Sequence, residues 1–282
     1  MERIERIIAR DPGNRGMGAL VVPGDLEAAA RALTAASKVM IATGFAVGPG
    51  HVAETDGPPG ALFLARVLAH LGKTVIVATH RSCFPVMAAG LRALDLSVAL
   101  EVLAPGEDPE PLFKRIEPDL VVTIELPGRA ADGQYYSMRG VPVTGWTSPL
   151  DGLLPLADAR SIPTVSVGDG GNEAGMGRVA DRVRTAVPRG GLIAAVLGAR
   201  HLVAAGTSNW GAYGLIAAVN PALLHTPEEE THLLNALVEA GAQDGVKLAP
   251  QATVDGLDPV TYLQVLLDLK AVPALTKGGA SA

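Results

Sequence analysis

Carboxylate side chains follow three short apolar runs in this sequence of 282 residues. The runs cover residues 38–43, 120–124 and 163–167, and each has the length and residue types of a buried β-strand. The acids in the segments behind them are Glu54, Asp56, Glu125, Asp169 and Glu173. Carboxylates gathered at one place cannot all stay ionised without a compensating cation. The pattern therefore predicts a site for a divalent ion, or carboxyls that exchange protons with a substrate.

Two roles can be assigned among these acids. We expect Asp56, Glu125 and Asp169 to bind a divalent metal, because oxygen-rich clusters favour hard ions such as Mg²⁺ or Mn²⁺. Glu54, Asp56 and Glu173 are the candidates for acid–base catalysis. A structural alternative stays open for the same residues. Asp and Asn are common in strand-to-helix turns, and Glu173 suits the first turn of a helix, where the helix dipole favours negative charge.

Two further segments offer groups that would bind an anion. The segment GDGGNEAGMG is expected to open a helix after a strand, so the backbone N–H groups of Gly170, Gly171 and Asn172 would face a carboxylate or phosphate. Ser208 and Asn209 follow the last predicted strand and either contact a ligand or form a plain turn. A G-x-G-x-x-A string at residues 175–180 lies inside the predicted helix turn, and no P-loop is present. We therefore expect no NAD.

The elements that must position these residues alternate along the chain. Strands are predicted at residues 38–43, 74–79, 98–103, 120–124, 163–167 and 201–205, and helices at 58–71, 82–94, 110–116, 210–219, 227–240 and 259–270. Continuous apolar strands between helices indicate a parallel sheet buried on both faces. We predict an α/β fold, a doubly wound and mostly parallel sheet with helices on both faces, in a Rossmann-like three-layer sandwich. In a 3-2-1-4-5 strand order, the acids meet at the carboxyl ends of neighbouring strands.

Domain organisation follows from the same pattern. Residues 1–275 are predicted to form one domain without internal repeats. Residues 128–156 are rich in Gly, Tyr and Pro and poorly periodic, so we expect an excursion that folds over the site. Residues 276–282 are expected to be a frayed tail.

Composition and charge exclude several classes of protein. The net charge is −6 and no run of Lys or Arg exceeds two residues, which argues against nucleic-acid binding. Cys83 is the one cysteine, so no internal disulfide forms, and a reducing compartment fits. The first residues lack the uncharged core of a signal peptide, and Arg200 and His201 interrupt the most apolar stretch. We expect a cytoplasmic protein without a membrane span, and leave a homo-oligomer open.

Three long blocks carry a resemblance to a known family. ATGFAV…ETDGPPGA, ELPGRAADGQYYSMRG and GDGGNEAGMG resemble the D-glutamate cyclase-like C-terminal domain family, in the family's order and over roughly residues 1–275. Members are linked to the conversion of D-glutamate into 5-oxo-D-proline and water, so the resemblance implies a lyase. The mammalian mitochondrial form carries this domain behind a second, hydro-lyase-like domain, to which no part of this sequence corresponds.

The chemistry of that cyclisation suits the predicted site. A neutral α-amine must attack the γ-carboxylate of the same molecule, which is a poor electrophile. A carboxylate base must take the amine proton, and a Lewis acid must neutralise the γ-carboxylate. Arg129 and Arg139 would pair with the α-carboxylate of this small anionic substrate as forked donors, and Tyr136 would help to orient it.

Two alternative functions use the same residues. The acids and the anion-binding loop would also serve a divalent-metal-dependent phosphatase or another hydrolase. A non-catalytic module that binds a small ligand would need the same cavity without turnover.

Overall fold

A six-stranded parallel sheet forms the centre of the computed structural model, which describes residues 1–273. In spatial order the strands are β5 (Ala99–Leu103), β4 (Thr74–His80), β1 (Lys38–Thr43), β6 (Leu120–Ile124), β7 (Thr164–Gly168) and β8 (His201–Ala204). Numbered along the chain this order is 3-2-1-4-5-6, so the predicted neighbours are confirmed. The predicted frayed tail, residues 276–282, lies outside the described residues.

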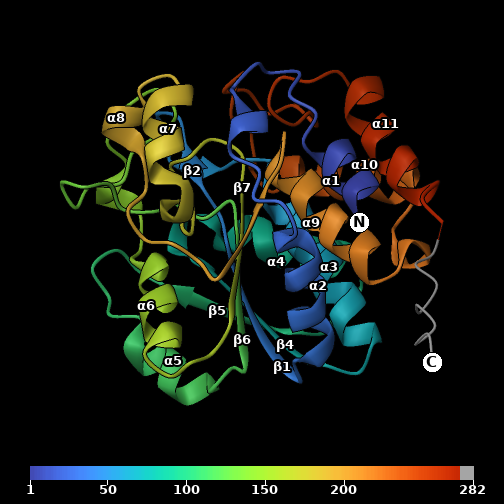
Figure 1. The fold of residues 1–282 in the computed structure, drawn as a ribbon, viewed down its shortest axis with the longest axis horizontal. Helices are drawn as coiled ribbons and strands as arrows, with labels where there is room; N and C mark the ends of the chain where they lie inside the picture. Colours follow the sequence, from blue (N-terminus) through green and yellow to red (C-terminus); the bar gives the residue numbers. More distant parts are fainter. Residues whose placement is uncertain (274–282) are drawn as a thin grey trace.

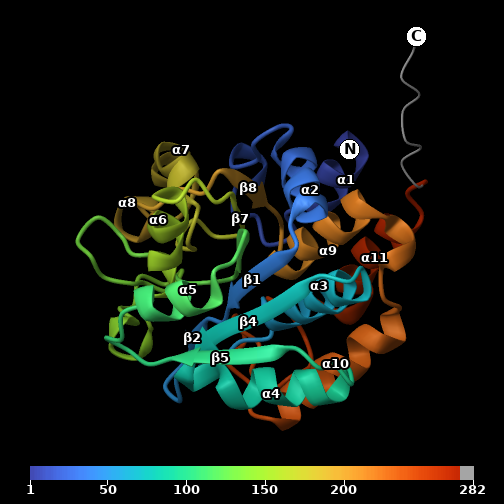
Figure 2. The same ribbon diagram turned by 90° about the horizontal axis from the view of Figure 1, so that it is seen from below.

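Helices cover both faces of the sheet (Figures 1 and 2). One layer holds α1 (Glu2–Ile8), α2 (Asp25–Ala35), α3 (Pro58–His70), α4 (Phe84–Ala93), α9 (Ser208–Val219), α10 (Pro227–Glu239) and α11 (Pro259–Lys270). The other holds α5 (Glu110–Ile116), α6 (Leu153–Asp158), α7 (Ala180–Ala186) and α8 (Gly190–Ile193). The predicted α/β three-layer architecture is therefore confirmed.

Strand β1 shows how the sheet separates two cores. Successive side chains of a strand point to opposite faces. Val39 and Ile41 accordingly pack with the helices of the first layer, whereas Met40 and Ala42 pack with the second. All four side chains are fully buried. Two-sided burial explains why the strand reads as a continuous apolar run and shows no alternation of polar and apolar residues.

The N-terminal segment holds two helices that the sequence analysis did not predict. Helix α1 is only 7 residues long, and it buries Ile4, Ile7 and Ile8. Helix α2 packs against α9 and β8. Between the two helices, a loop that includes Arg15 reaches the carboxyl ends of β7 and β8. Local sequence gives little sign of this placement, because α1 is too short for a convincing helical period.

Helix α9 begins two residues earlier than predicted. Thr207 caps it by accepting a hydrogen bond from the Trp210 backbone N–H at 3.1 Å. Ser208 and Asn209 therefore belong to the first helical turn and do not form a plain turn. Their backbone N–H groups are free of helical partners there and can bind an acid.

The segment after β1 contains a short antiparallel hairpin, β2 (Ala46–Val47) and β3 (Val52–Ala53). It brings Glu54 back toward the sheet directly before α3. Within residues 1–273, no helix is both long and apolar enough to cross a membrane.

Candidate active site

Three carboxylates converge at the carboxyl ends of the sheet, as the strand order predicted. Asp56 lies in the segment between β1 and α3, Glu125 is the first residue after β6, and Asp169 is the first residue after β7. All three are buried, and one oxygen from each lies within 4.8 Å of the others. The spacing would allow one divalent cation to contact all three acids.

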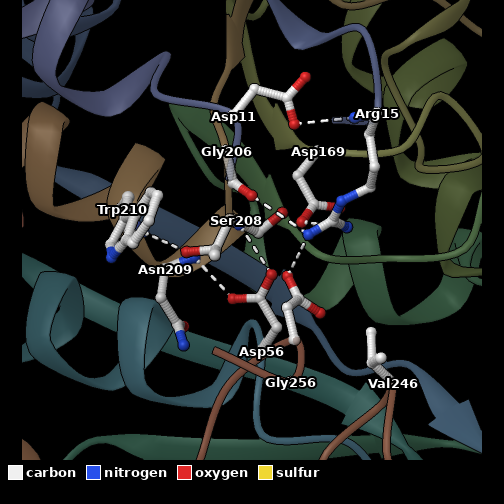
Figure 3. Close-up of polar contacts among 12 residues, drawn as sticks. Asp11, Arg15, Asp56, Asp169, Gly206, Ser208, Asn209, Trp210, Val246 and Gly256 are labelled. Carbon is white, nitrogen blue, oxygen red and sulfur yellow. Dashed lines mark hydrogen bonds and ion pairs between the residues drawn. The ribbon is translucent and has the colours of Figure 1, made fainter. Parts of the chain in front are cut away.

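Asp56 is held by the first turn of α9. The backbone N–H groups of Ser208 and Asn209 each donate to one of its oxygens at 2.8 Å, as Figure 3 shows. The Ser208 hydroxyl donates to Glu125 Oε2 at 2.5 Å. Ser208 thus connects two acids of the cluster, and the positive end of the helix dipole favours their charge.

The Asn209 side chain stabilises the backbone on either side of Asp56. Its Oδ1 accepts hydrogen bonds from the backbone N–H groups of Gly57 and Gly60 at 3.0 and 2.9 Å. Its Nδ2 donates to the Thr55 carbonyl at 3.1 Å. The side chain therefore orders the turn into α3. Neither Ser208 nor Asn209 lines the cavity described below.

Glu125 has an uncommon backbone conformation for a non-glycine residue, with φ of +43°. Residues in this left-handed region carry strain and concentrate at functional sites. Gly57 makes room for it, since a Cβ on Gly57 would lie 2.5 Å from the Cβ of Glu125. The glycine after Asp56 is therefore required by the position of a neighbouring acid.

Arg15 supplies a cation that the sequence analysis did not identify. Its guanidinium donates to Asp169 Oδ2 at 2.8 Å, to Asp255 Oδ2 at 2.6 Å and to the Gly206 carbonyl at 3.2 Å. Asp11 shapes the loop by accepting a hydrogen bond from the backbone N–H of Arg15, which Figure 3 shows. It also accepts hydrogen bonds from the backbone N–H groups of the two residues after Arg15. The Gly- and Pro-rich run DPGNRGMG marks a turn but does not indicate where that turn lies in space.

Asp255 is a second site residue absent from the prediction. It lies in a loop that Asp244 organises, because that buried carboxylate accepts bonds from the backbone of Val246, Lys247 and Gly256. Asp255 itself has φ of +52°. The Asp-Gly pair in the sequence signals a turn, yet no local signal connects it with strands more than 80 residues earlier.

Glu54 differs from the other acids because no hydrogen-bond donor within residues 1–273 contacts its carboxyl. The side chain is buried. A Cβ on Gly245 would lie 2.0 Å from Glu54 Oε2, so the glycine lets this loop cover the acid. Burial raises the pKa of Glu54 well above its usual range, and the charges of Asp255 and Asp169 raise it further.

The predicted anion-binding loop is organised by one of its own acids. Glu173 accepts hydrogen bonds from the backbone N–H groups of Asp169 at 3.2 Å and Gly171 at 2.7 Å. The Gly171 N–H is therefore used inside the loop, and neither Gly170 nor Gly171 lines the cavity. Asn172 does line it: Nδ2 donates to the Tyr136 carbonyl at 2.8 Å, while the buried Oδ1 has no donor within the described residues.

The predicted substrate-binding residues of the 128–156 excursion separate into two groups. Arg129 pairs with buried Asp151 through two bonds of 2.7 Å, away from the cavity. The Tyr136 hydroxyl donates to Asp132 at 2.5 Å, and its carbonyl holds Asn172. Arg139 lines the cavity and donates to the carbonyls of Gly245 and Val246 at 3.1 and 2.7 Å, across the gap between two loops.

These groups enclose a cavity of about 370 Å³ with two chemically different walls. The acidic wall consists of Glu54, Glu125, Asp169 and Asp255, with Arg15 and Asn172 beside them. The apolar wall consists of Phe45, Val47, Met138, Pro188 and Val246. The arrangement suits a small ligand that presents polar groups to buried acids and carbon atoms to the opposite side.

Fold and site together define a class: an α/β protein with a cluster of buried carboxylates at the carboxyl ends of parallel strands, beside a cavity. The chain belongs to the D-glutamate cyclase-like, C-terminal family, whose model matches residues 4–270. The predicted family is confirmed.

A curated relative matches most of this chain but is a longer protein. The mitochondrial D-glutamate cyclase of Homo sapiens is 37% identical over 245 residues, which cover 78% of this chain and 38% of the human protein. The chain therefore spans less than half the length of that relative. The cyclase carries the word mitochondrial in its name, and the cytoplasmic location expected for this chain stays a prediction.

Solved structures give weaker likenesses. An exopolyphosphatase-related protein from Bacteroides fragilis matches with a TM-score of 0.44 and 9% sequence identity. The match covers 89% of this chain and 58% of the exopolyphosphatase-related chain. The sugar isomerase domain of an RpiR transcription factor from Sphaerobacter thermophilus matches with a TM-score of 0.29 and 18% sequence identity. That match covers 80% of this chain and 91% of the isomerase-domain chain. We draw no functional conclusion from either.

The buried acids predict an unusual pH dependence of stability in metal-free protein. Burial raises the pKa of Asp169 to about 6 and that of Asp255 to about 7, although Arg15 opposes both shifts. An exposed Asp has a pKa of about 4. The folded protein therefore binds more protons than the unfolded chain between about pH 4 and pH 7, and the free energy of unfolding should fall as pH rises through this window.

Urea unfolding of EDTA-treated protein measures this effect. Asp255→Asn should show a shallower decline than the wild type, because it removes one of the titrating groups. Asp181→Asn is the matched control, since its side chain is 97% exposed. Identical pH profiles for Asp255→Asn and the wild type would contradict the assignment.

Proposed function

We propose that this chain is a lyase of the D-glutamate cyclase type, which converts D-glutamate into 5-oxo-D-proline and water. The observation that carries the proposal is the buried carboxylate cluster facing a cavity, in a member of this family. In the reaction, the α-amine nitrogen forms a bond to the γ-carbon, and one γ-oxygen leaves as water. Counted from the ammonium and the γ-carboxylate, two protons must move from the nitrogen to the departing oxygen, so the enzyme needs a group that accepts and returns protons.

Glu54 is the best candidate for the proton transfer. It lines the cavity, and no donor within residues 1–273 engages its carboxyl. Burial and the neighbouring carboxylates raise the pKa of Glu54, so this carboxyl accepts a proton more readily than an exposed glutamate does. Glu173 has both oxygens engaged by loop N–H groups, so we assign it a positioning role.

The substrate's charged groups have partners on the same cavity. The Asn172 Oδ1 is a buried acceptor that can bind the substrate's ammonium. Arg139 uses two of its donors on backbone carbonyls, and a guanidinium has five N–H donors in all. The remaining donors would bind the α-carboxylate. We assign Arg129 no role in substrate binding, because its guanidinium already donates two hydrogen bonds to the Asp151 carboxylate.

A divalent ion, Mg²⁺ or Mn²⁺, completes the proposed site. Asp56, Glu125 and Asp169 would hold it, since each carboxylate has lone pairs beyond those used in the bonds described above. Bound there, the ion would neutralise the γ-carboxylate and make its carbon a better electrophile.

Product formation tests the reaction. Chiral chromatography should detect 5-oxo-D-proline when the protein is incubated with D-glutamate, and Glu54→Gln should lower kcat at least about 100-fold, because the shape stays while the base is lost. Glu239→Gln on the exposed end of α10 is the matched control and should retain wild-type kcat. Hydrolysis of a phosphate ester without formation of 5-oxo-D-proline would instead support the phosphatase alternative.

Metal binding is tested separately by calorimetry with Mn²⁺ on EDTA-treated protein. Asp169→Asn should raise the Kd about tenfold or more, because it removes one charge from an oxygen cluster while nearly keeping its shape. Asp181→Asn removes a surface charge and should leave the Kd unchanged. A wild-type protein that binds neither Mn²⁺ nor Mg²⁺ would leave the acids with proton-transfer roles alone.

Arg139 should contribute mainly to substrate binding. Arg139→Ala removes a charge-assisted bond of about 1.5–3 kcal/mol, so kcat/KM for D-glutamate should fall roughly ten- to hundredfold. Arg200→Ala is the matched control, because this exposed arginine precedes β8 at the opposite end of the sheet. An Arg139→Ala variant of normal stability and unchanged kcat/KM would place the arginine outside the site.

A further inference from the structure

The cavity is larger and more apolar than D-glutamate requires. Its volume of about 370 Å³ lies in the range of roughly 300–1,000 Å³ that pockets for drug-sized ligands occupy. Glutamate has ten non-hydrogen atoms and a side chain of two methylene groups before its second carboxylate. Five apolar residues on one wall therefore have little of this substrate to contact.

Both walls begin at buried residues, since Phe45 and Val47 of the apolar wall are 2% and 7% exposed, but only the apolar wall extends to an exposed residue. Glu54, Glu125 and Asp169 are buried, so the acidic wall forms the floor of the cavity. Met138 is half-buried and Val246 is 51% exposed, so the apolar wall continues to the mouth. A substrate whose reacting carbonyl faces the acids can therefore extend an apolar group along Met138 and Val246 toward solvent.

Charge favours a substrate with one carboxylate over a substrate with two. Four carboxyls line the cavity, and Arg15 is already bonded to two of them, Asp169 and Asp255. Each further carboxylate brought among these acids adds like-charge repulsion. Free D-glutamate brings two carboxylates, whereas glutamate substituted at its γ-carbonyl brings one.

We propose that the site also cyclises γ-amides of D-glutamate that carry an apolar amine, and that the Phe45–Val47–Met138–Val246 wall binds the leaving amine. The proposal rests on the proposed function, because the same α-amine attacks the same γ-carbon. A neutral γ-carbonyl is also a better electrophile than a carboxylate.

The step balances without a further reactant. The neutral α-amine nitrogen bonds to the γ-carbon, and the C–N bond to the leaving amine breaks. Glu54 takes the proton released by the attacking nitrogen and gives it to the leaving nitrogen. The products are 5-oxo-D-proline and a free amine, no water is consumed, and nothing is oxidised or reduced.

The experiment compares the γ-p-nitroanilide of D-glutamate with D-glutamate itself, on the same preparation of the full chain with Mn²⁺ present. Release of p-nitroaniline and formation of 5-oxo-D-proline are followed together, so that cyclisation is separated from hydrolysis to glutamate. An amide is used because esters of this kind cyclise unaided in water. We expect equal yields of the two products, a kcat/KM at least tenfold above that for D-glutamate, and loss of both activities in Glu54→Gln.

Val246→Asn tests the wall. It should lower the ratio of kcat/KM for the anilide to that for D-glutamate about five- to tenfold, the low end for an apolar contact because Val246 is half exposed. Val260→Asn is the matched control, since Val260 is 77% exposed on α11 and does not line the cavity, and it should leave the ratio unchanged. An unchanged ratio in Val246→Asn would overturn the assignment of the wall.

The remaining outcomes separate this inference from the proposed function. Cyclisation of D-glutamate without turnover of the anilide, or hydrolysis of the anilide to glutamate, would overturn the inference and leave the proposed function standing. Cyclisation of the anilide alone would support the inference and remove free D-glutamate as the substrate. Failure with both compounds would overturn both.

Discussion

Burial of negative charge is the constraint on which this end of the sheet depends. Six carboxyls gather there, and within the described part of the chain Arg15 is the cation that bonds two of them, Asp169 and Asp255. Burying a carboxylate costs several kcal/mol unless other groups compensate. Five of the six have a partner. The first turn of α9 binds Asp56, the Ser208 hydroxyl binds Glu125, Arg15 binds both Asp169 and Asp255, and backbone N–H groups of its own loop bind Glu173. Among residues 1–273, Glu54 has no such partner, and its carboxyl faces the cavity.

A second set of aspartates fixes the loops that surround the cluster. Asp11 orders the backbone around Arg15, and Asp244 orders the loop that carries Val246 and Asp255. Both acids accept hydrogen bonds from backbone N–H groups of their own loops, and Asp244 also accepts one from the Thr253 hydroxyl. A loop held in this way can position a charged side chain within the tolerance that catalysis requires. The site thus depends on residues that never face the cavity.

The two walls of the cavity differ in chemistry and in the elements that carry them. The acidic floor lies at the strand ends, where the sheet fixes the distances among the carboxylates. The apolar wall comes from the hairpin after β1, from the 128–156 excursion and from the loop around Val246. Arg139 joins the last two across the mouth. The sheet thus fixes Glu125 and Asp169 directly, whereas Glu54, Asp255 and the apolar wall lie in loops whose ends the fold holds in place.

The sequence by itself determined the strands, their order and the convergence of Asp56, Glu125 and Asp169, because buried parallel strands are continuous apolar runs and their carboxyl ends share one edge. It did not determine the parts that long-range packing decides. Arg15 and Asp255 stand some 240 residues apart and meet only in the folded chain, where an ion pair joins them. Arg129 and Arg139 are equivalent as sequence signals, yet buried Asp151 takes the first and leaves the second at the cavity. Local patterns fix which residues form an element. Which charges become partners depends on how those elements pack, because pairing of charges has no period along the chain.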